Sequence, residues 1–395
     1  MRITGYRTLT TAQEWGRPVG DANGVYADGV MPVPIILVDT DEGITGVGLG
    51  PHVEAAAVFA AIDGEDPRAV TALYDRMLRQ TFKAGHAGVV FGTIGAFDTA
   101  LWDIKAQAAG EPLWRLLGGR DRSVHAYASG LDIGLTDEEL VATYQGYAQL
   151  GLRAAKLKGG LDIERDRHRL TLVREVLTEA ARGARPGLML DANESWTRKQ
   201  AVRHVGELER TLDLTWIEEP VRRWDADGLA VVSRGVRASV ASGENLTGLE
   251  QFRPLIAAGG LDIVQTAAVW GVTHFLRVAA LAHAHDLPVS PIGNTPVALL
   301  HAATSVPNHL ASELQLLGPP VGLTLDLHVA DGAFILGRSP GLGVRIDEAA
   351  ITARYRRTAP APDGPHVRPE RAGRQLLAVS NHNGGTPQPH PIEVR

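Results

Sequence analysis

Short apolar runs alternate with polar turns and amphipathic stretches from about residue 124 to residue 315. Apolar runs bounded by turn residues are typical of buried strands, and the stretches between them have the three- and four-residue spacing of helices. Such an alternation, repeated eight times, predicts a parallel β/α barrel. The predicted strands cover residues 124–128, 154–158, 188–192, 214–218, 238–243, 261–265, 287–291 and 310–315.

A doubly wound sheet is the competing interpretation of the same alternation. Such a sheet would carry a glycine-rich dinucleotide-binding loop after its first strand. The first predicted strand instead runs into Ala128-Ser-Gly-Leu, which lacks that pattern. The barrel is therefore favoured.

The residues before the barrel have a different pattern. Strand-like segments on either side of Asp41-Glu-Gly43 predict a β-hairpin with a tight turn. A loop rich in glycine and polar residues, from about Gln13 to Met31, precedes that hairpin, and loops of this length are usually either disordered or functional lids. Helical spacing is strongest at residues 93–105.

These patterns divide the chain into four parts. Residues 1–120 are expected to form an α+β domain, residues 121–318 the barrel with the active site, and residues 319–355 a set of short strands that returns to the N-terminal region. Residues 356–395 are rich in proline, glycine, histidine and arginine, a composition typical of a flexible tail without chemistry.

Composition narrows the functional classes. A chain of 395 residues with 44% hydrophobic and 21% charged residues is typical of a soluble globular protein with more than one core. The absence of cysteine excludes disulfides, thiolate metal sites and cysteine nucleophiles. A net charge of −6 without a basic stripe argues against nucleic-acid binding. With neither a membrane-length apolar run nor a leader-like start, we expect no membrane association and a cytoplasmic location.

An acidic residue stands at the end of three successive predicted strands. Asp191, Glu218 and Glu244 are 27 and 26 residues apart, about one β/α unit each. In a barrel this spacing places three carboxylates side by side at the C-terminal end, where barrel enzymes have their sites. Clustered anions require a cation, and a set of oxygen donors favours Mg²⁺. One such acid alone could cap a helix or pair with arginine, but three at matched spacing are poorly explained in that way.

Two lysines end the strand that precedes Asp191. Lys156 and Lys158 are two residues apart, so their side chains point to the same side of the strand. Two close ammonium groups near a dication lower each other's pKa, which makes a lysine usable as a base near neutral pH. The alternative is an exposed pair on an edge strand, but the apolar neighbours favour a buried strand.

In these motifs and their order the chain resembles the enolase superfamily, in its mandelate racemase and muconate lactonizing branch. The resemblance covers about residues 1–350. It rests on Ala96-Phe-Asp-Thr-Ala-Leu-Trp-Asp-Ile-Lys105, Leu116-Leu-Gly-Gly119, Lys-x-Lys, Asp-x-Asn, Trp-Ile-Glu-Glu-Pro, Ser-Gly-Glu-Asn and Pro340-Gly-Leu-Gly-Val344.

The resemblance implies a fold, a metal and roles for these residues. The fold would be a modified (β/α)7β barrel under an α+β capping domain built from both ends of the chain. Asp191, Glu218 and Glu244 would bind Mg²⁺. Lys158 would be the base on one face of a small carboxylate substrate, and Lys156 would hold the carboxylate. Because family members commonly form homo-oligomers, an oligomer is expected.

Two positions depart from the family's pattern. The racemases place an aspartate after strand six and a histidine after strand seven, which together form a second base opposite the lysine. Ala267 and Pro291 stand there instead. The lysine that the lactonizing enzymes have after strand six is also missing, since Ala268, Val269 and Trp270 occupy that stretch.

The missing second base affects which reaction is favoured. Racemisation usually needs bases on both faces, whereas elimination on one face needs only Lys158. Dehydration of a sugar acid is therefore the first hypothesis. A racemase, epimerase or cycloisomerase whose second acid comes from the capping loops is the alternative, and a catalytically idle binding barrel is the non-enzymatic one.

Five further residues are candidate substrate or supporting contacts. By resemblance Glu313 would bond the substrate carboxylate, with a helix cap as the alternative. Asn193 and Asn245 are adjacent to the predicted ligands and are expected to orient them. Asn294 is a candidate substrate contact. His52 is a candidate acid or specificity residue, with an ordinary surface histidine as the alternative.

Overall fold

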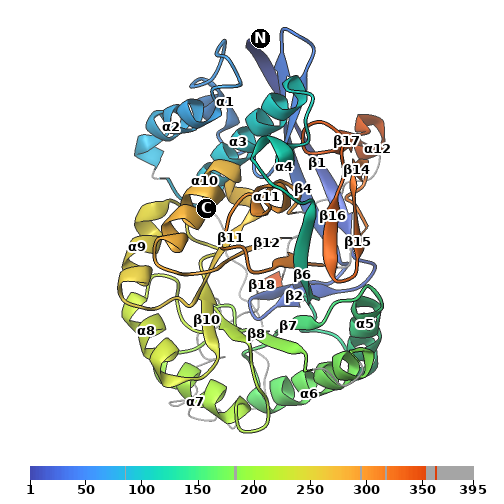
Figure 1. The fold of residues 1–395 in the computed structure, drawn as a ribbon, viewed down its shortest axis with the longest axis vertical. Coiled ribbons are helices and arrows are strands. Elements are labelled where there is room, and N and C mark those ends of the chain that lie inside the picture. The colour runs from blue at the N-terminus through green and yellow to red at the C-terminus, as the bar shows by residue number, and fades with distance from the viewer. Residues whose placement is uncertain (85, 182–184, 294–295, 316–317, 353–360, 363–395) are drawn as a thin grey trace, which may run out of the picture.

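The computed structural model describes residues 1–84, 86–181, 185–293, 296–315, 318–352 and 361–362. Within these residues a barrel of strands lies below a smaller group of strands and helices, and helices cover the outside of the barrel (Figure 1). Each of the eight predicted barrel strands coincides with an observed strand. They are β6 (Ser123–Ser129), β7 (Ala154–Lys158), β8 (Gly187–Asp191), β9 (Trp216–Glu218), β10 (Ser239–Ser242), β11 (Ile263–Ala267), β12 (Val289–Ile292) and β13 (Ser312–Leu314).

The barrel closes between its first and last strands. Neighbouring strands from β6 to β12 are paired in chain order and in parallel, and β13 pairs with β6. The Leu310 N–H donates to the Val289 carbonyl at 2.9 Å, and the Ser290 hydroxyl donates to the Ala311 carbonyl at 2.8 Å, which joins β13 to β12. The helices between the strands are α5 (Asp137–Gln149), α6 (Ile163–Ala180), α7 (Arg198–Leu208), α8 (Ala226–Gly235), α9 (Leu249–Ala257), α10 (Val272–His283), preceded by the short η2 (Ala268–Trp270), and α11 (Val297–Ala303). The (β/α)7β prediction is confirmed.

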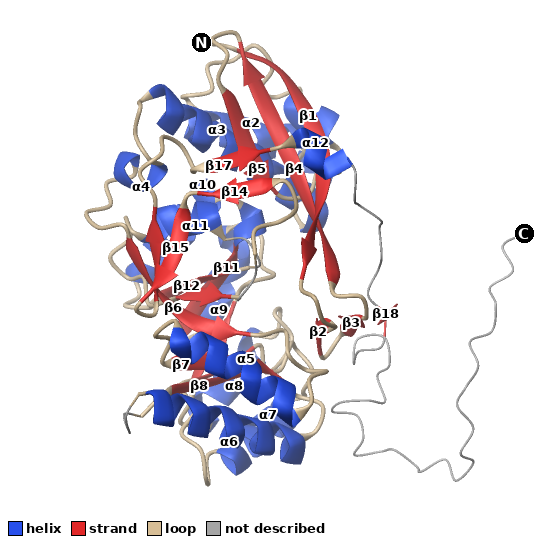
Figure 2. Ribbon diagram, turned by 90° about the vertical axis from the view of Figure 1, so that its right-hand side faces the viewer, coloured by secondary structure: helices blue, strands red, loops and turns tan. Residues whose placement is uncertain are grey.

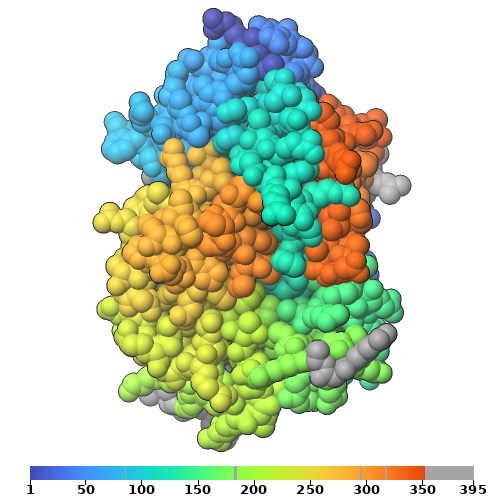
Figure 3. Space-filling model, viewed as in Figure 1, coloured from blue at the N-terminus to red at the C-terminus, as the bar shows by residue number. Residues whose placement is uncertain are grey.

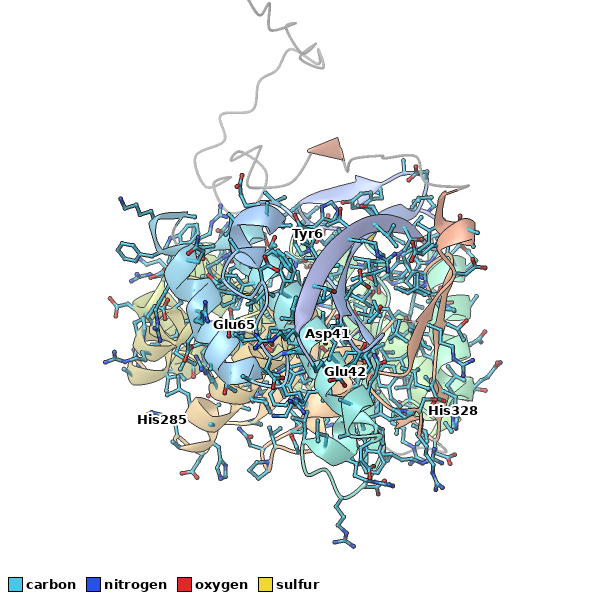
Figure 4. The ribbon with its side chains drawn as sticks, turned by 90° about the horizontal axis from the view of Figure 1, so that it is seen from above. Tyr6, Asp41, Glu42, Glu65, His285 and His328 are labelled. Atoms are coloured by element: carbon cyan, nitrogen blue, oxygen red, sulfur yellow. The ribbon has the colours of Figure 1, made fainter. Side chains whose placement is uncertain are left out.

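The capping domain is built on the antiparallel sheet β1 (Ile3–Glu14), β4 (Val30–Thr40) and β5 (Thr45–Leu49). The predicted hairpin is therefore present as β4–β5. Asp41 and Glu42 lie close together at its turn (Figure 4), and the Met1 ammonium is 2.5 Å from Glu42 Oε1. The other elements before the barrel are α1 (Ala55–Phe59), α2 (Val70–Gln80), η1 (Phe82–Ala84), α3 (Gly88–Ala108) and α4 (Leu113–Leu116).

Helix α3 joins the capping sheet to the barrel through two buried aspartates. Asp103 accepts from the Val47 N–H at 2.9 Å and from the Leu342 N–H at 2.7 Å, which binds β5 and the segment after the barrel to one helix. Asp98 accepts from the Thr273 N–H at 2.8 Å and from its hydroxyl, which fixes α3 to the start of α10. Breaking such hydrogen bonds is costly, because a buried carboxylate or N–H group that loses its partner is left unsatisfied. The predicted helix at residues 93–105 therefore lies within the element that connects the two parts.

The predicted loop from Gln13 to Met31 is partly wrong. Its ends belong to β1 and β4, which pair as far as Glu14 and Val30, and its middle forms the small hairpin β2 (Val19–Asp21) and β3 (Gly24–Tyr26). Figure 2 shows this hairpin beyond the lower ends of β1 and β4. The strands are longer than their sequences suggest because cross-strand pairing, rather than propensity, sets where a hairpin arm ends.

The segment after the barrel returns to both parts of the molecule. Its elements are β14 (Leu323–Leu325), β15 (Leu327–Ala330), β16 (Ala333–Leu336), β17 (Val344–Ile346) and α12 (Glu348–Thr352). β16 pairs antiparallel with β6, and in the space-filling view this orange-red segment lies directly beside the teal residues that lead into β6 (Figure 3). Leu323 and Ile351 pack with Ile35, Leu37 and Val47 of the capping sheet.

The limits of the four predicted parts stay a prediction. β6 begins at Ser123 and β13 ends at Leu314, inside the range 121–318 expected for the barrel. The predicted tail, residues 356–395, lies outside the described residues except for β18 (Ala361–Pro362), whose backbone pairs with β3. In the described part of the chain no helix has both the length and the apolar character needed to cross a membrane.

Candidate active site

Strand register brings the predicted residues together at the C-terminal end of the barrel. Lys158 of β7 is the Cα partner of Asp191 of β8, which is in turn the partner of Glu218 of β9. Met189 and Trp216 pack together in the barrel interior, and residues two apart on a strand face the same side. Asp191 and Glu218 therefore also point inward, and both are fully buried.

The two lysines contact these carboxylates directly. Lys156 Nζ is 2.5 Å from Glu218 Oε1, 3.2 Å from Glu313 Oε1 and 3.8 Å from Asp191 Oδ2. Lys158 Nζ donates to Asp191 Oδ2. Both lysine side chains are buried, so the exposed edge-strand alternative does not hold.

The two asparagines lie against the predicted ligands. The Asn193 N–H and Nδ2 donate to the two oxygens of Asp191 at 2.8 and 3.2 Å. Asn245 Nδ2 donates to Glu244 Oε1 at 2.9 Å and to Glu219 Oε1 at 3.0 Å. Glu244 itself follows the end of β10 and is half-buried. These contacts are the orienting kind that was expected of residues next to ligands.

Burial and neighbouring charges determine the protonation of the acids. Burial raises the pKa of Glu218 to about 8 and that of Glu244 to about 7. Burial also acts on Asp191 and Glu313, but the adjacent lysines outweigh it and lower the pKa of both carboxyls, that of Glu313 to about 2. Two ammonium groups thus keep some of the acids ionised and leave Glu218 and Glu244 short of positive charge.

The expected lowering of the lysine pKa values beside a dication stays a prediction, and the protein groups alone shift both pKa values upward. Burial lowers the pKa of Lys158, but the charges of Asp191, Glu244 and Asp21 together outweigh burial and the net shift is upward. Burial likewise lowers the pKa of Lys156, and Glu218 together with the other acidic groups around it more than reverses this effect. The carboxylates around each lysine oppose the lowering that the neighbouring ammonium group and a dication would cause.

The donor set fits Mg²⁺ in its chemistry. Among the described residues no three acidic or histidine side chains are placed closely enough to surround a metal ion. The Lys156 ammonium group lies within 4 Å of the carboxylates of Asp191, Glu218 and Glu313. Asp191, Glu218 and Glu244 nevertheless supply only hard oxygen donors, which Mg²⁺ prefers. Burial raises the pKa of Glu218 and of Glu244, and a dication bound between the three acids would oppose that rise.

The remaining candidates have different outcomes. Glu313 lies in β13, facing Lys156, and accepts from the Gly293 N–H at 2.9 Å, so it does not begin a helix. His52 is half-buried with Nε2 3.1 Å from the Thr10 hydroxyl, and in the described residues no hydrogen bond or ion pair joins it to the carboxylates. Asn294 lies outside the described residues.

The two positions at which a second base was expected lie on neighbouring strands. Ala267 ends β11 beside Ile292 of β12, and Pro291 is the buried partner of Thr266. Ala267 is on the same side of β11 as Ile263, whereas Pro291, the partner of Thr266, points to the other side of the sheet. Neither side chain can transfer a proton.

Sequence reasoning missed two residues that the fold brings to this site. Gln265 Nε2 donates to Glu218 Oε2 at 2.6 Å, and its position two residues after Ile263, which faces the interior, could have indicated this. Asp21 is the last residue of β2 and lies in the small hairpin β2–β3, called the capping hairpin from here on. Burial raises its pKa and Lys158 partly offsets the rise, so this carboxylate lies close enough to interact with the predicted base.

Two family descriptions match the chain. "Mandelate racemase / muconate lactonizing enzyme, N-terminal domain" matches residues 9–118, and "Enolase C-terminal domain-like" matches residues 139–350. The chain belongs to the mandelate racemase and muconate lactonizing branch of the enolase superfamily. The family assignment made from the motifs is confirmed, and with it the combination of a capping domain and a barrel.

Relatives and solved structures of this family include several enzymes of sugar acids. The chain is 33% identical over 325 residues to 3,6-anhydro-alpha-L-galactonate cycloisomerase from Streptomyces coelicolor, covering 79% of this chain and 88% of the relative. It is 31% identical over 359 residues to L-talarate/galactarate dehydratase from Salmonella typhimurium, covering 84% and 86%. A crystal structure of L-talarate dehydratase from Polaromonas sp. JS666, complexed with Mg and L-glucarate, superposes with a TM-score of 0.80 at 29% identity, covering 91% of this chain and 99% of that one. The family thus comprises lyases and isomerases, and this chain is an enzyme of the same family.

Proposed function

We propose that the protein is a Mg²⁺-dependent enzyme that removes the proton next to the carboxylate of a sugar acid and then eliminates water. The observation that carries this proposal is the contact of Lys156 and Lys158 with Asp191 and Glu218 on three consecutive strands, with Glu244 following the next strand. Relatives named as sugar-acid dehydratases support the substrate class.

The residues have distinct roles in this proposal. A proton next to a carboxylate is weakly acidic, because its removal places a second negative charge on the same small group. Mg²⁺ held by Asp191, Glu218 and Glu244 would supply positive charge to the substrate carboxylate as that charge develops. Lys156, a buried ammonium group beside Glu313, would hold the carboxylate from the other direction. Lys158 would accept the proton once the charge of Asp191 is offset, since Asp191 otherwise keeps it in its ammonium form.

The product follows from bond accounting. The α C–H bond breaks and its proton goes to Lys158, the electron pair forms the carbon–carbon double bond of an enol, and the β C–O bond breaks. The departing hydroxide takes a proton and leaves as water, and the enol tautomerises to a 2-oxo-3-deoxy acid. Ala267 and Pro291 offer no proton-transfer group opposite Lys158, which favours loss of the hydroxyl on the lysine face.

Cycloisomerisation is the second candidate, because the Streptomyces coelicolor relative carries out that kind of reaction at 33% identity. It begins with a comparable proton abstraction and therefore makes the same demands on Lys158. Product mass separates the two reactions: a dehydration product has lost the mass of one water, and an isomerisation product has kept it.

A panel of acid sugars tests the proposal. D-Galactonate, arabinonate, galactarate, L-talarate and 3,6-anhydro-L-galactonate are incubated with the enzyme and Mg²⁺, and products are measured by mass spectrometry, with EDTA as the control. We expect turnover of at least one acid, abolished by EDTA, and a decrease of about 10²- to 10⁴-fold in Lys158→Met, the range for loss of a general base. Exchange of the α-proton in D₂O that persists in Lys158→Met would contradict the assignment of the base. A homo-oligomeric state and a cytoplasmic location stay predictions.

A further inference from the structure

Asp132, in the loop after β6, is a fully buried acid that the proposed chemistry does not use. Its Oδ1 accepts from the backbone N–H of Lys158 at 3.0 Å and from Arg169 Nη2 at 2.9 Å, and its Oδ2 accepts from the Tyr144 hydroxyl at 2.6 Å. Arg169 and Tyr144 are also buried, on α6 and α5. One carboxylate therefore joins two helices of the barrel wall to the backbone of the predicted base.

The same cluster holds the lysine backbone from other directions. Arg169 Nη1 donates to the Lys158 carbonyl at 2.6 Å, and the Tyr144 hydroxyl is 2.9 Å from the Lys156 carbonyl. Side chains thus contact both backbone groups of Lys158 and the carbonyl of Lys156. A buried ion pair such as Asp132–Arg169 is often no more stabilising than an apolar substitute, because both charges lose their hydration. Fixing the geometry of β7 at its end is a better explanation for it than stability.

The capping hairpin docks on the same loop. The Gly20 N–H donates to the Leu131 carbonyl at 3.1 Å, and Gly20 forms a parallel bridge with Asp132. Arg17 Nη2 donates to the Gly130 carbonyl at 2.5 Å. The hairpin that carries Asp21 therefore contacts residues 130–132, whose last member bonds the predicted base.

We propose that Asp132 is a positioning residue for Lys158, and that docking of the capping hairpin on residues 130–132 acts on the base through it. The inference rests on the proposed role of Lys158. Small displacements of a proton acceptor have large effects, because about 1 Å of misplacement can lower a rate by about 10²-fold. Closure of the hairpin over a substrate and correct placement of the base would then be one event.

Two tyrosines on α5 provide a matched test. Tyr144 and Tyr147 are both buried, and each has its hydroxyl within hydrogen-bond distance of a strand-end carbonyl. Tyr144 donates to Asp132, whereas Tyr147 donates to the Ser129 carbonyl at 2.6 Å. Using the panel acid that is turned over, we expect Tyr144→Phe to lower kcat about tenfold, with KM and the calorimetric Mg²⁺ affinity within about twofold. Tyr147→Phe should lose similar thermal stability while kcat stays within about twofold. Equal loss of kcat in the two variants would overturn the positioning role.

Hydrogen exchange of the Lys158 amide can be measured without a substrate and accompanies this comparison. Asp132→Asn keeps an oxygen that can accept from the Lys158 N–H but loses the charge that pairs with Arg169. We expect faster hydrogen exchange of the Lys158 amide than in the wild-type protein, and a larger loss of kcat than in Tyr144→Phe. Unchanged exchange and kcat would refute the inference and leave the proposed function intact, since the latter depends on loss of α-proton exchange in Lys158→Met.

A double-mutant cycle tests the link to the hairpin. Arg17→Ala removes the bond to the Gly130 carbonyl, and Tyr144→Phe removes a bond within the Asp132 cluster. If hairpin docking acts through this cluster, the effects of the two changes on kcat will be non-additive, because residues in one network are coupled. Additive effects would show that the hairpin and the base are independent.

Discussion

Lys158 and Asp191 are paired twice: their Cα atoms are partners across β7 and β8, and the Lys158 ammonium group donates to the Asp191 carboxylate. The strand pairing fixes the positions of the two Cα atoms, and the ion pair fixes the positions of the charged groups. The predicted base and the first predicted metal ligand therefore lie side by side in the barrel, and each favours the ionised form of the other.

Asp191→Asn tests this relationship from the ligand side. The substitution keeps the shape of the side chain and its contact with the Asn193 N–H, but removes the charge. We expect the affinity for Mg²⁺, measured by isothermal titration calorimetry, to fall at least about tenfold, since a neutral amide is a weaker ligand for a hard dication. Wild-type affinity in Asp191→Asn would remove this residue from the metal site.

Asp21→Asn tests the carboxylate that the hairpin contributes. Asp21 Oδ1 accepts from the Asn23 N–H at 2.6 Å, a bond that an asparagine side chain can also make. The hairpin should therefore keep its turn, while the acid near Lys158 is lost. If this acid protonates the leaving hydroxyl, kcat for the panel acid will fall about 10²-fold with an unchanged melting temperature.

Asp21→Ala is the control for that experiment. It removes both the acid and the turn contact, so we expect the same loss of kcat together with increased proteolysis of the hairpin. A wild-type kcat in Asp21→Asn, with a loss only in Asp21→Ala, would limit Asp21 to stabilising the hairpin.

His301 makes the folded protein sensitive to acid. Its Nδ1 accepts from the Trp114 N–H at 3.0 Å, and burial lowers its pKa from 6.5 to about 4. Between these two values the unfolded chain binds a proton that the folded protein does not bind, so the free energy of unfolding decreases as the pH falls from 6.5 to 4. The slope is about 1.4 kcal/mol per pH unit, and the total loss about 3 kcal/mol. His301→Asn keeps an acceptor near Nδ1 and should reduce this slope in denaturant titrations; an unchanged slope would assign the acid sensitivity to other groups.

Asp103→Ala tests the connection between the capping sheet and the segment after the barrel. The backbone N–H groups of Val47 and Leu342 would both lose a buried acceptor, at about 1–3 kcal/mol each. We expect a lower melting temperature by calorimetry and faster hydrogen exchange at both amides. Asp63→Ala, at an exposed position, is the control and should leave the melting temperature unchanged.

Residues on regular strands could be predicted from the sequence, because their direction follows from the two-residue period. Asp191, Glu218 and the lysine pair lie where apolar runs end, and one β/α unit separates each strand from the next. The motif Asp98-Thr-Ala-Leu-Trp-Asp103 was likewise recognised as a helix, although its function in joining three segments depends on partners that are distant in the chain.

The remaining features depend on contacts between segments that have no mutual signal in the sequence. The upward pKa shift of Lys158 comes from the carboxylates around it, which the spacing of the lysines does not reveal. Asp132 lies in a loop and Asp21 ends the three-residue strand β2, so neither has a run of apolar neighbours long enough to indicate its direction. His52 resembles a site residue by its position after a glycine-rich turn, but its bond to Thr10 depends on how β1 lies beside that turn.

Asp98 and Thr273 attach α3 of the capping domain to α10 of the barrel. This attachment fixes the capping domain to the barrel at a point away from the small hairpin β2–β3, whose contacts to the barrel run through residues 17–23. A change in the hairpin therefore leaves the joint between the two domains intact but reaches the predicted base, because the hairpin contacts residues 130–132.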